Sequence, residues 1–158
     1  MNARKRPPGR RQRRELDVTS QIEGRYAAQA LKLVRQHNVR VCHWRANMTG
    51  IAWLGHPDRV IEAPHPKSSM SFAVLAHEVG HQALGRVTPR WREEQQAWLF
   101  ALQAMETFGV PVTQSVLDRY ASSMRYALAK AHRRGLKAIP AELLEFLTDD
   151  ERKALTGK

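Results

Sequence analysis

The sequence predicts an α+β fold, with a small three-stranded sheet, a long buried helix after it and further C-terminal helices. The strand-like runs are short and lie together between residues 39 and 63, whereas helical spacing dominates from residue 68 onward. Strands that are grouped in the chain, and do not alternate with helices, are typical of this class. The length of 158 residues suits one ordinary domain.

The first half of the chain is expected to hold one helix and the three strands. Apolar and aromatic side chains recur at helical spacing over residues 19–37, with Thr19 or Asp17 as a candidate cap. Short, partly alternating runs at 39–44, 50–54 and 59–62 predict the strands, and turn signals separate them. Two prolines after the third run close the sheet.

The second half is expected to be helical. A helix from Ser68 or Ser69 to about Gly85 is apolar all round between residues 72 and 76, which predicts that it is buried. The next helix is expected to have Thr88 as its cap, Pro89 as its first residue and Met105 near its end. Further helices are predicted at 113–134, 140–147 and after Thr148, where a capping-box pattern stands.

The positive charge of the chain is concentrated at its start. The formal net charge is +11, and seven of the 26 Lys and Arg residues lie within residues 1–14, which contain no acid. We expect residues 1–14 to form a disordered basic arm. Such an arm is either a solvated tail or, through residues 4–14, a nonspecific contact for nucleic acid.

Composition also limits the class of protein and its compartment. No run of about 18 apolar residues is present, so the sequence predicts no transmembrane helix and no membrane partner. The basic start is not followed by an apolar segment, as a secretory signal would require. The single cysteine, Cys42, cannot form an internal disulfide. We therefore expect a cytoplasmic location.

The segment with the clearest chemistry is His77-Glu78-Val79-Gly80-His81. On a helix, His77 and His81 project from one face, so that both imidazoles can bind one Zn²⁺. Glu78 then lies beside the metal and not on it, where it can take a proton from the attacking water. Placing these polar groups on an otherwise apolar helix is costly unless a metal satisfies them. Gly80 costs helix stability, which predicts a close approach there.

A third zinc ligand is expected on the following helix. Glu94, Ala97 and Ala101 share one face of that helix, and the two alanines allow it to pack closely on the metal helix. Glu94 is therefore the preferred ligand. Glu93, one residue out of this register, is the alternative.

These residues resemble the ImmA/IrrE-type zinc metallopeptidases of the gluzincin group. The resemblance covers about residues 20–110, and rests on the His-Glu-x-x-His segment and on Glu94-x-x-Ala97-x-x-Phe100-Ala101. It implies a zincin-like fold, His77, His81 and Glu94 as zinc ligands, and Glu78 as the catalytic general base. It also implies that an edge strand, here residues 59–62, holds a peptide by strand addition.

The chain departs from the family pattern at Trp98, where the family has Asn or Asp to support a ligand histidine. No residue stands out as the stabiliser of the oxyanion, and His43, Tyr120 and His132 are all candidates. The expected organisation is a basic arm (1–14), a zincin-like metallopeptidase core (15–112) and a C-terminal helical extension packed on the core (113–158).

Two functions follow as expectations. The first is a zinc-dependent metalloendopeptidase that hydrolyses an intracellular protein substrate, such as a repressor-like regulator. The alternative is a zincin-fold binding module or assembly component that docks on nucleic acid or a protein partner. That module would use the basic arm and a set of bases on the helix at 113–134, namely Arg119, Arg125, Lys130, His132, Arg133 and Arg134.

Overall fold

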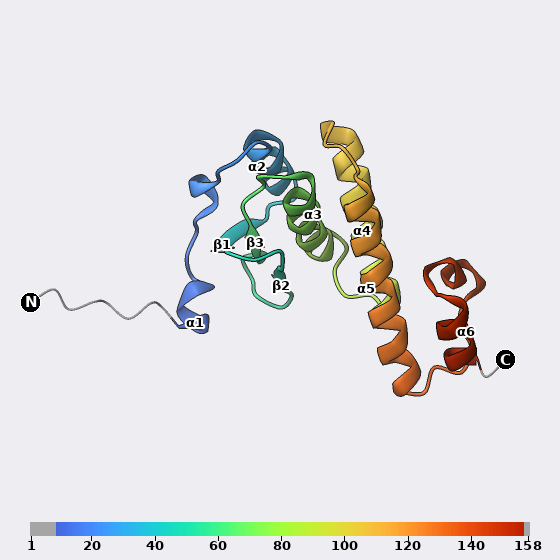
Figure 1. Ribbon diagram of the computed structural model, residues 1–158. Coiled ribbons are helices and arrows are strands. Elements are labelled where there is room, and N and C mark those ends of the chain that lie inside the picture. The colour runs from blue at the N-terminus through green and yellow to red at the C-terminus, as the bar shows by residue number, and fades with distance from the viewer. Residues whose placement is uncertain (1–8, 157–158) are drawn as a thin grey trace, which may run out of the picture.

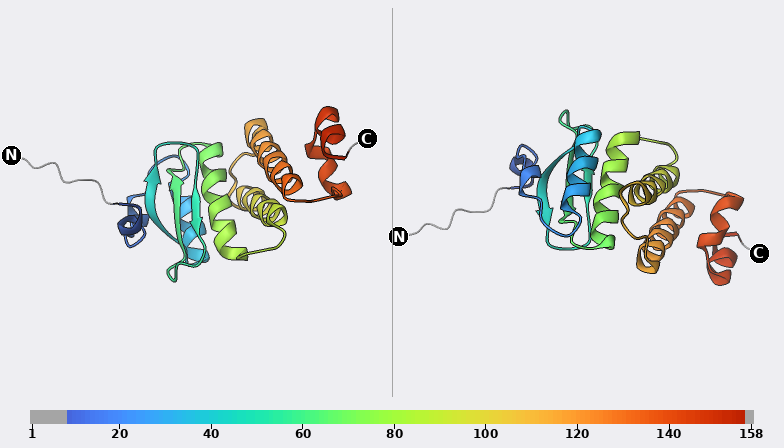
Figure 2. Two further views of the ribbon diagram at one scale, coloured as in Figure 1. Left: turned by 90° about the horizontal axis from the view of Figure 1, so that it is seen from below. Right: turned by 90° about the horizontal axis from the view of Figure 1, so that it is seen from above.

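The computed structural model describes residues 9–156 and has the α+β architecture that the sequence predicts. The elements stack as successive layers from the sheet to the C-terminal helices (Figures 1 and 2). The sheet is followed by α2 (Ala27–Gln36) and α3 (Ser69–Leu84), then by α4 (Arg90–Phe108) and α5 (Gln114–Arg133). A 3-10 helix, η2 (Ala141–Phe146), and α6 (Asp149–Thr156) complete the chain.

The sheet has the order β1-β3-β2, formed by β1 (Arg40–Arg45), β2 (Ile51–Trp53) and β3 (Val60–Pro64). β3 pairs in parallel with β1 and antiparallel with β2. The prediction that residues 59–62 form an edge strand is therefore wrong, because this segment is the central strand. Every residue of β3 is buried, which suits a strand that is covered on both faces and paired at both edges. β2 is the edge strand nearest α3.

The expected helix over residues 19–37 is shorter than predicted. Residues Thr19–Gln21 form a single 3-10 turn, η1, and α2 begins only at Ala27. The hydroxyl of Thr19 accepts a hydrogen bond from the Val41 backbone at 2.9 Å, so it holds β1 and caps no helix. At Gly24, with φ of +116°, a Cβ would lie 2.9 Å from the Lys67 backbone. The chain turns here, and the helix cannot extend through the turn.

The helix ends of α3 and α4 follow the sequence signals closely. Ser68 caps α3, since its hydroxyl accepts from the Ser71 backbone at 3.2 Å, and Gly85 ends the helix with φ of +71°. α4 begins one residue later than predicted, with Pro89 at the cap position. Midway along α3, a Cβ on Gly80 would meet the Ala97 carbonyl at 3.1 Å. The close approach predicted at Gly80 is thus the packing of α3 on α4.

Of the C-terminal helices, α5 packs on α4, and η2 packs on α5. Thr113 caps α5 through a hydrogen bond from the Val116 backbone at 3.3 Å. Tyr120 of α5 contacts Phe146 of η2, with ring centroids 4.9 Å apart. The predicted capping box at Thr148 is present, because Glu151 and Thr148 exchange side chain-to-backbone hydrogen bonds at 2.8 and 3.2 Å.

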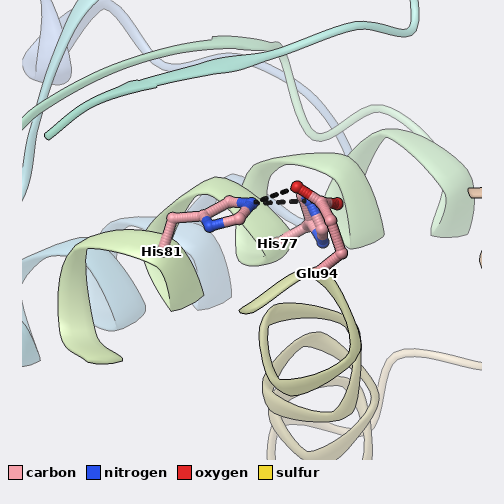
Figure 3. Close-up of side chains that lie close together, drawn as sticks. All are labelled: His77, His81 and Glu94. Carbon is pink, nitrogen blue, oxygen red and sulfur yellow. Dashed lines mark hydrogen bonds and ion pairs between the residues drawn. The ribbon is translucent and has the colours of Figure 1, made fainter. Parts of the chain in front are cut away.

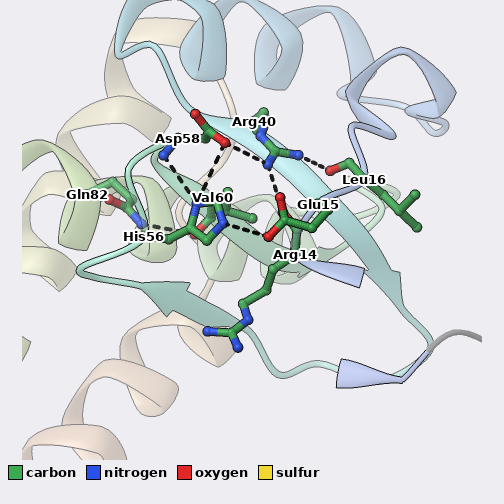
Figure 4. Close-up of polar contacts among 8 residues, drawn as sticks. All are labelled: Arg14, Glu15, Leu16, Arg40, His56, Asp58, Val60 and Gln82. Carbon is green, nitrogen blue, oxygen red and sulfur yellow. Dashed lines mark hydrogen bonds and ion pairs between the residues drawn. The ribbon is translucent and has the colours of Figure 1, made fainter. Parts of the chain in front are cut away.

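The start of the chain is more ordered than expected over its described part. Residues Arg10–Arg13 form a helical turn, α1, where the sequence predicted a disordered arm. The guanidinium of Arg14 lies 4.6 Å from the centre of the Trp53 ring, a favourable cation–π contact. Arg40 then holds the segment, as Figure 4 shows, by donating to the Arg14 carbonyl at 2.7 Å and to the Leu16 carbonyl.

Residues 1–8 of the predicted arm lie outside the described residues, and nucleic-acid contact by residues 4–14 stays a prediction. Two of the seven arginines and lysines of that arm, Arg10 and Arg14, are placed over Trp53. Over residues 9–156, none of the helices combines the length and the hydropathy that crossing a bilayer requires.

Candidate metal centre

α3 and α4 bring His77, His81 and Glu94 together at the interface of the two helices (Figure 3). Nε2 of His77 lies 3.3 Å from Oε2 of Glu94, and Nε2 of His81 lies 3.2 Å from Oε1 of the same carboxylate. The two Nε2 atoms are 3.1 Å apart. The four-residue spacing on one helix and the carboxylate from the next therefore converge at one point.

The separations among these atoms fit a tetrahedral zinc site. Bonds of about 2.0–2.1 Å and tetrahedral angles place neighbouring ligand atoms about 3.3 Å apart. The structure gives 3.1 Å between the two Nε2 atoms, and each Nε2 lies at a similar distance from a different oxygen of Glu94, 3.2 Å from Oε1 for His81 and 3.3 Å from Oε2 for His77. Three protein ligands leave one tetrahedral position open, which is the pattern of catalytic zinc sites.

Burial makes a metal at this point physically reasonable. His77 is 7% exposed and His81 is 4% exposed, so both imidazoles have little contact with bulk water. Two neutral imidazoles and a carboxylate that direct lone pairs at one another repel, unless a proton or a cation lies between them. A divalent cation satisfies all three groups at once.

Glu93 supports the site from the opposite side of His81. Its Oε1 lies 3.2 Å from Nδ1 of His81, which is an ion-pair distance at which the two atoms do not align for a hydrogen bond, and its other oxygen accepts from the Val87 backbone at 3.2 Å. The carboxylate is 4% exposed and is also bound by Arg90. A carboxylate this close to the second nitrogen of a histidine favours the tautomer with its proton on that nitrogen, through charge and not through a formed hydrogen bond. Glu93, the alternative ligand of the sequence analysis, thus orients His81 and stands outside the cluster of ligand atoms.

This arrangement predicts different effects for the two neighbouring glutamates. Glu93→Gln is expected to weaken zinc binding by about 10- to 100-fold, because the imidazole loses its charged support and keeps its ligand set. A competition titration with a chromophoric chelator measures the change. Glu106→Gln, an exposed change on the same helix, is the matched control and should leave zinc affinity unaltered. Complete loss of zinc in Glu93→Gln would instead make Glu93 a direct ligand.

His77 is held by packing on its other side. The Trp98 ring lies against its imidazole, with centroids 4.6 Å apart, and Trp98 in turn stacks on Tyr120. Within residues 9–156, the buried Nδ1 of His77 has no hydrogen-bond partner. The family that the sequence resembles has Asn or Asp at the position of Trp98. Here the Trp98 ring orients His77 by packing alone.

A cleft of about 430 Å³ gives access to the ligands. On the sheet side it is lined by the loop before β2 and by the first residues of that strand, and α3 contributes Val74 and the three polar residues of its His-Glu-x-x-His segment. Glu78 lines this cleft. A Cβ on Gly50 would lie 2.5 Å from Cγ of Glu78 and 2.9 Å from its Oε1. Only a glycine at position 50 lets the loop approach Glu78 this closely. The sequence indicated only that Gly50 lies in a turn.

The pKa values of the two carboxyl groups at the site are shifted in opposite directions. Burial raises the pKa of Glu78, because the charged form loses its hydration. Burial also acts to raise the pKa of Glu94, but hydrogen bonds with His77 and His81 outweigh it and hold that pKa well below its usual value. Glu94 is thus kept as an anion suited to binding a cation, whereas Glu78 is suited to accepting a proton.

None of the three candidate oxyanion stabilisers lines the cleft in the part of the chain that the structure describes. Tyr120 is buried behind Trp98, and His43 lines a separate hollow on the sheet. Arg119 of α5 lines the cleft instead, and its guanidinium donates to the Met48 carbonyl at 2.9 Å. Sequence reasoning missed Arg119 in this role, since it named the residue only among the helix bases.

A second group of potential ligands, Glu15, His56 and Asp58, lies on the sheet side (Figure 4). Glu15 and Asp58 are exposed, and the Arg40 guanidinium already lies 3.3 Å from Asp58. A cation placed there would be repelled by that arginine, so this group is the weaker candidate.

The helix bases proposed to grip nucleic acid or a partner do not all remain free. Arg119 faces the metal cleft, and Arg125 lies 3.5 Å from Glu151.

In comparisons with known proteins, the chain matches no family model, no curated protein and no solved structure. The function is therefore argued from the site itself.

Proposed function

We propose that this protein is a zinc-dependent metalloendopeptidase with a zincin-like fold, related to the ImmA/IrrE type that its sequence resembles. His77, His81 and Glu94 would hold the zinc, and Glu78 would act as the general base. The observation that carries the proposal is that His77, His81 and Glu94 bring potential ligand atoms together at one point beside a buried carboxylate.

Glu78 and Arg119 would have different roles in peptide hydrolysis. When bound, zinc lowers the pKa of water and polarises the substrate carbonyl. Glu78, whose pKa burial raises, accepts the proton from the attacking water and later returns it to the leaving amine. Arg119 places a positive charge in the same cleft, where it can hold a substrate carbonyl or stabilise the developing oxyanion.

The edge of the sheet offers a place for an extended substrate. β2 pairs with β3 on one side only, and Ile51 and Ala52 line the metal cleft. A peptide added along β2 would use backbone hydrogen bonds, which are independent of its sequence, and would run past Glu78. This mode suits an endopeptidase acting on an extended segment of an intracellular protein, and a repressor-like regulator is the substrate that the resemblance suggests.

A reducing, cytoplasmic compartment suits the one cysteine of the chain. Cys42 is buried and unpaired, and burial raises the pKa of its thiol to about 11. A thiol of this kind behaves as a small apolar side chain and plays no part in the proposed chemistry.

The proposal is tested by metal-dependent cleavage of an unfolded protein. Casein should be cut at internal bonds by the zinc-loaded full chain, and removal of zinc with 1,10-phenanthroline should stop the reaction. Adding back an equivalent of zinc should restore it. Cleavage that persists in the metal-free protein would contradict a zinc mechanism, and absence of any cleavage by the loaded protein would contradict peptidase activity.

Gly50 provides a test of the geometry around Glu78. Gly50→Val places a side chain where Cγ of Glu78 now lies, so the carboxylate must move. A displacement of about 1 Å is enough to reduce catalysis about 100-fold. Casein cleavage and zinc content are measured together, and zinc should be unchanged. Gly55→Val is the control, because nothing lies within 4 Å of a Cβ there, although its φ of +96° adds local strain. Equal activity of both variants would contradict the assigned role of Gly50.

A further inference from the structure

A second cleft, of about 710 Å³, adjoins the metal cleft. It lies between the beginning of α4 and the last turns of α5, and three residues, Arg90, Glu94 and Ser123, line both clefts. A peptide whose scissile bond lies at the metal ligands would therefore place a neighbouring residue in the second cleft.

The walls of this second cleft are largely apolar. Trp91 forms one side, and Ala127, Ala131 and Leu136 contribute to the other. Tyr126 stands at the opening with 68% of its surface exposed, the largest value among the exposed large hydrophobic residues described. Nε1 of Trp91 is buried and lacks a hydrogen-bond partner within residues 9–156. A space of this size and lining suits one large apolar or aromatic side chain.

The opening of the cleft carries positive charge that the described residues do not neutralise. Lys130 and Arg134 both line it, and over residues 9–156 neither has a carboxylate within ion-pair distance. Arg90, by contrast, is paired with Glu93 and Glu94. A carboxylate near the apolar side chain would therefore find two free cations, whereas a lysine would be repelled.

We infer that the second cleft is a substrate subsite that selects a large apolar side chain with an acidic residue next to it. This inference rests on the proposed function, because it assumes that a peptide lies across the metal site and continues into the second cleft. It names the substrate class as segments that pair an aromatic or large aliphatic residue with Asp or Glu, and it assigns the selection to α4 and α5.

Binding to an inactive protein tests the subsite separately from catalysis. The zinc-loaded, full-length Glu78→Gln protein is titrated into four fluorescein-labelled octapeptides that differ only at two central positions, Phe-Asp, Phe-Ala, Phe-Lys and Ala-Asp. Fluorescence anisotropy gives each Kd. Phe-Asp should bind about tenfold or more tightly than Ala-Asp, and Phe-Lys should bind most weakly of the Phe peptides. The advantage of Asp over Ala should shrink as salt is raised.

Variants test which residues produce the preference for Asp and which produce the preference for Phe. Changing both Lys130→Gln and Arg134→Gln should remove the advantage of Asp and leave the affinity for Phe-Ala unchanged. Lys137→Gln, an exposed lysine that does not line the cleft, is the matched control and should change nothing. Ala127→Trp should narrow the apolar part of the cleft and weaken the preference for Phe. Tyr126→Ala, at an exposed position that carries no risk to folding, should weaken that preference.

The outcomes of these experiments distinguish a failure of the subsite inference from a failure of the peptidase proposal. If the four peptides bind equally, or if the preference for Phe survives undiminished in both Ala127→Trp and Tyr126→Ala, the subsite is wrong. Casein cleavage by the unaltered protein together with equal peptide binding would leave the peptidase proposal standing alone. Preferential binding of Phe-Asp without any cleavage would establish the cleft as a peptide site and overturn the peptidase proposal.

Discussion

Glu78→Gln is expected to reduce peptide cleavage by about 100- to 10,000-fold while zinc stays bound. Glutamine has nearly the shape of glutamate but cannot accept the proton of the attacking water. Because Glu78 lies outside the cluster of ligand atoms, its replacement should leave the metal site intact. Cleavage of casein under saturating zinc, with zinc content determined on the same samples, measures both quantities.

The matched control for this change is Glu106→Gln, which makes the same substitution at an exposed position on α4. It should retain full activity and full zinc. If Glu78→Gln keeps more than a tenth of the activity, Glu78 does not act as the base. If it loses zinc together with activity, Glu78 has a role in holding the metal that its position does not suggest.

His81→Ala is expected to have the largest effect on the metal itself. Removal of one of three protein ligands should lower zinc content to near zero after dialysis, because the remaining histidine and carboxylate hold the ion far less tightly. The stabilisation that zinc gives to the folded chain should disappear with it, since a ligand that binds only the native state raises its stability. Elemental analysis and thermal unfolding with and without zinc measure these two effects.

His56→Ala is the control for His81→Ala, because His56 belongs to the second, exposed group of candidate ligands. Its zinc content should match that of the unaltered protein. Loss of zinc in His56→Ala, with zinc retained in His81→Ala, would move the metal to the sheet side of the molecule.

Local signals in the sequence predicted much of this structure. Ser68 and Thr148 cap helices as expected, because a capping hydrogen bond spans only a few residues and its pattern is visible in the chain. The spacing of His77 and His81 likewise needs only a helix to bring the two imidazoles together. Glu94 required one further assumption, that α4 packs on α3 along its small residues, and the contact at Gly80 bears this out.

The features that sequence reasoning missed depend on contacts between distant segments. The central position of β3 follows from its parallel pairing with β1, which no local pattern specifies. Gly50 is needed because Glu78, 28 positions later, occupies the space of its side chain. The support of His81 by Glu93 depends on the rotation of α4 about its own axis. In each case the decisive quantity is a distance across the fold.

The central claim is that His77, His81 and Glu94 hold one zinc ion, and the zinc content of the purified full-length protein tests it most directly. Elemental mass spectrometry after dialysis against metal-free buffer should find about one zinc per chain. A protein that contains no zinc, and takes up none when zinc is supplied, would contradict the account.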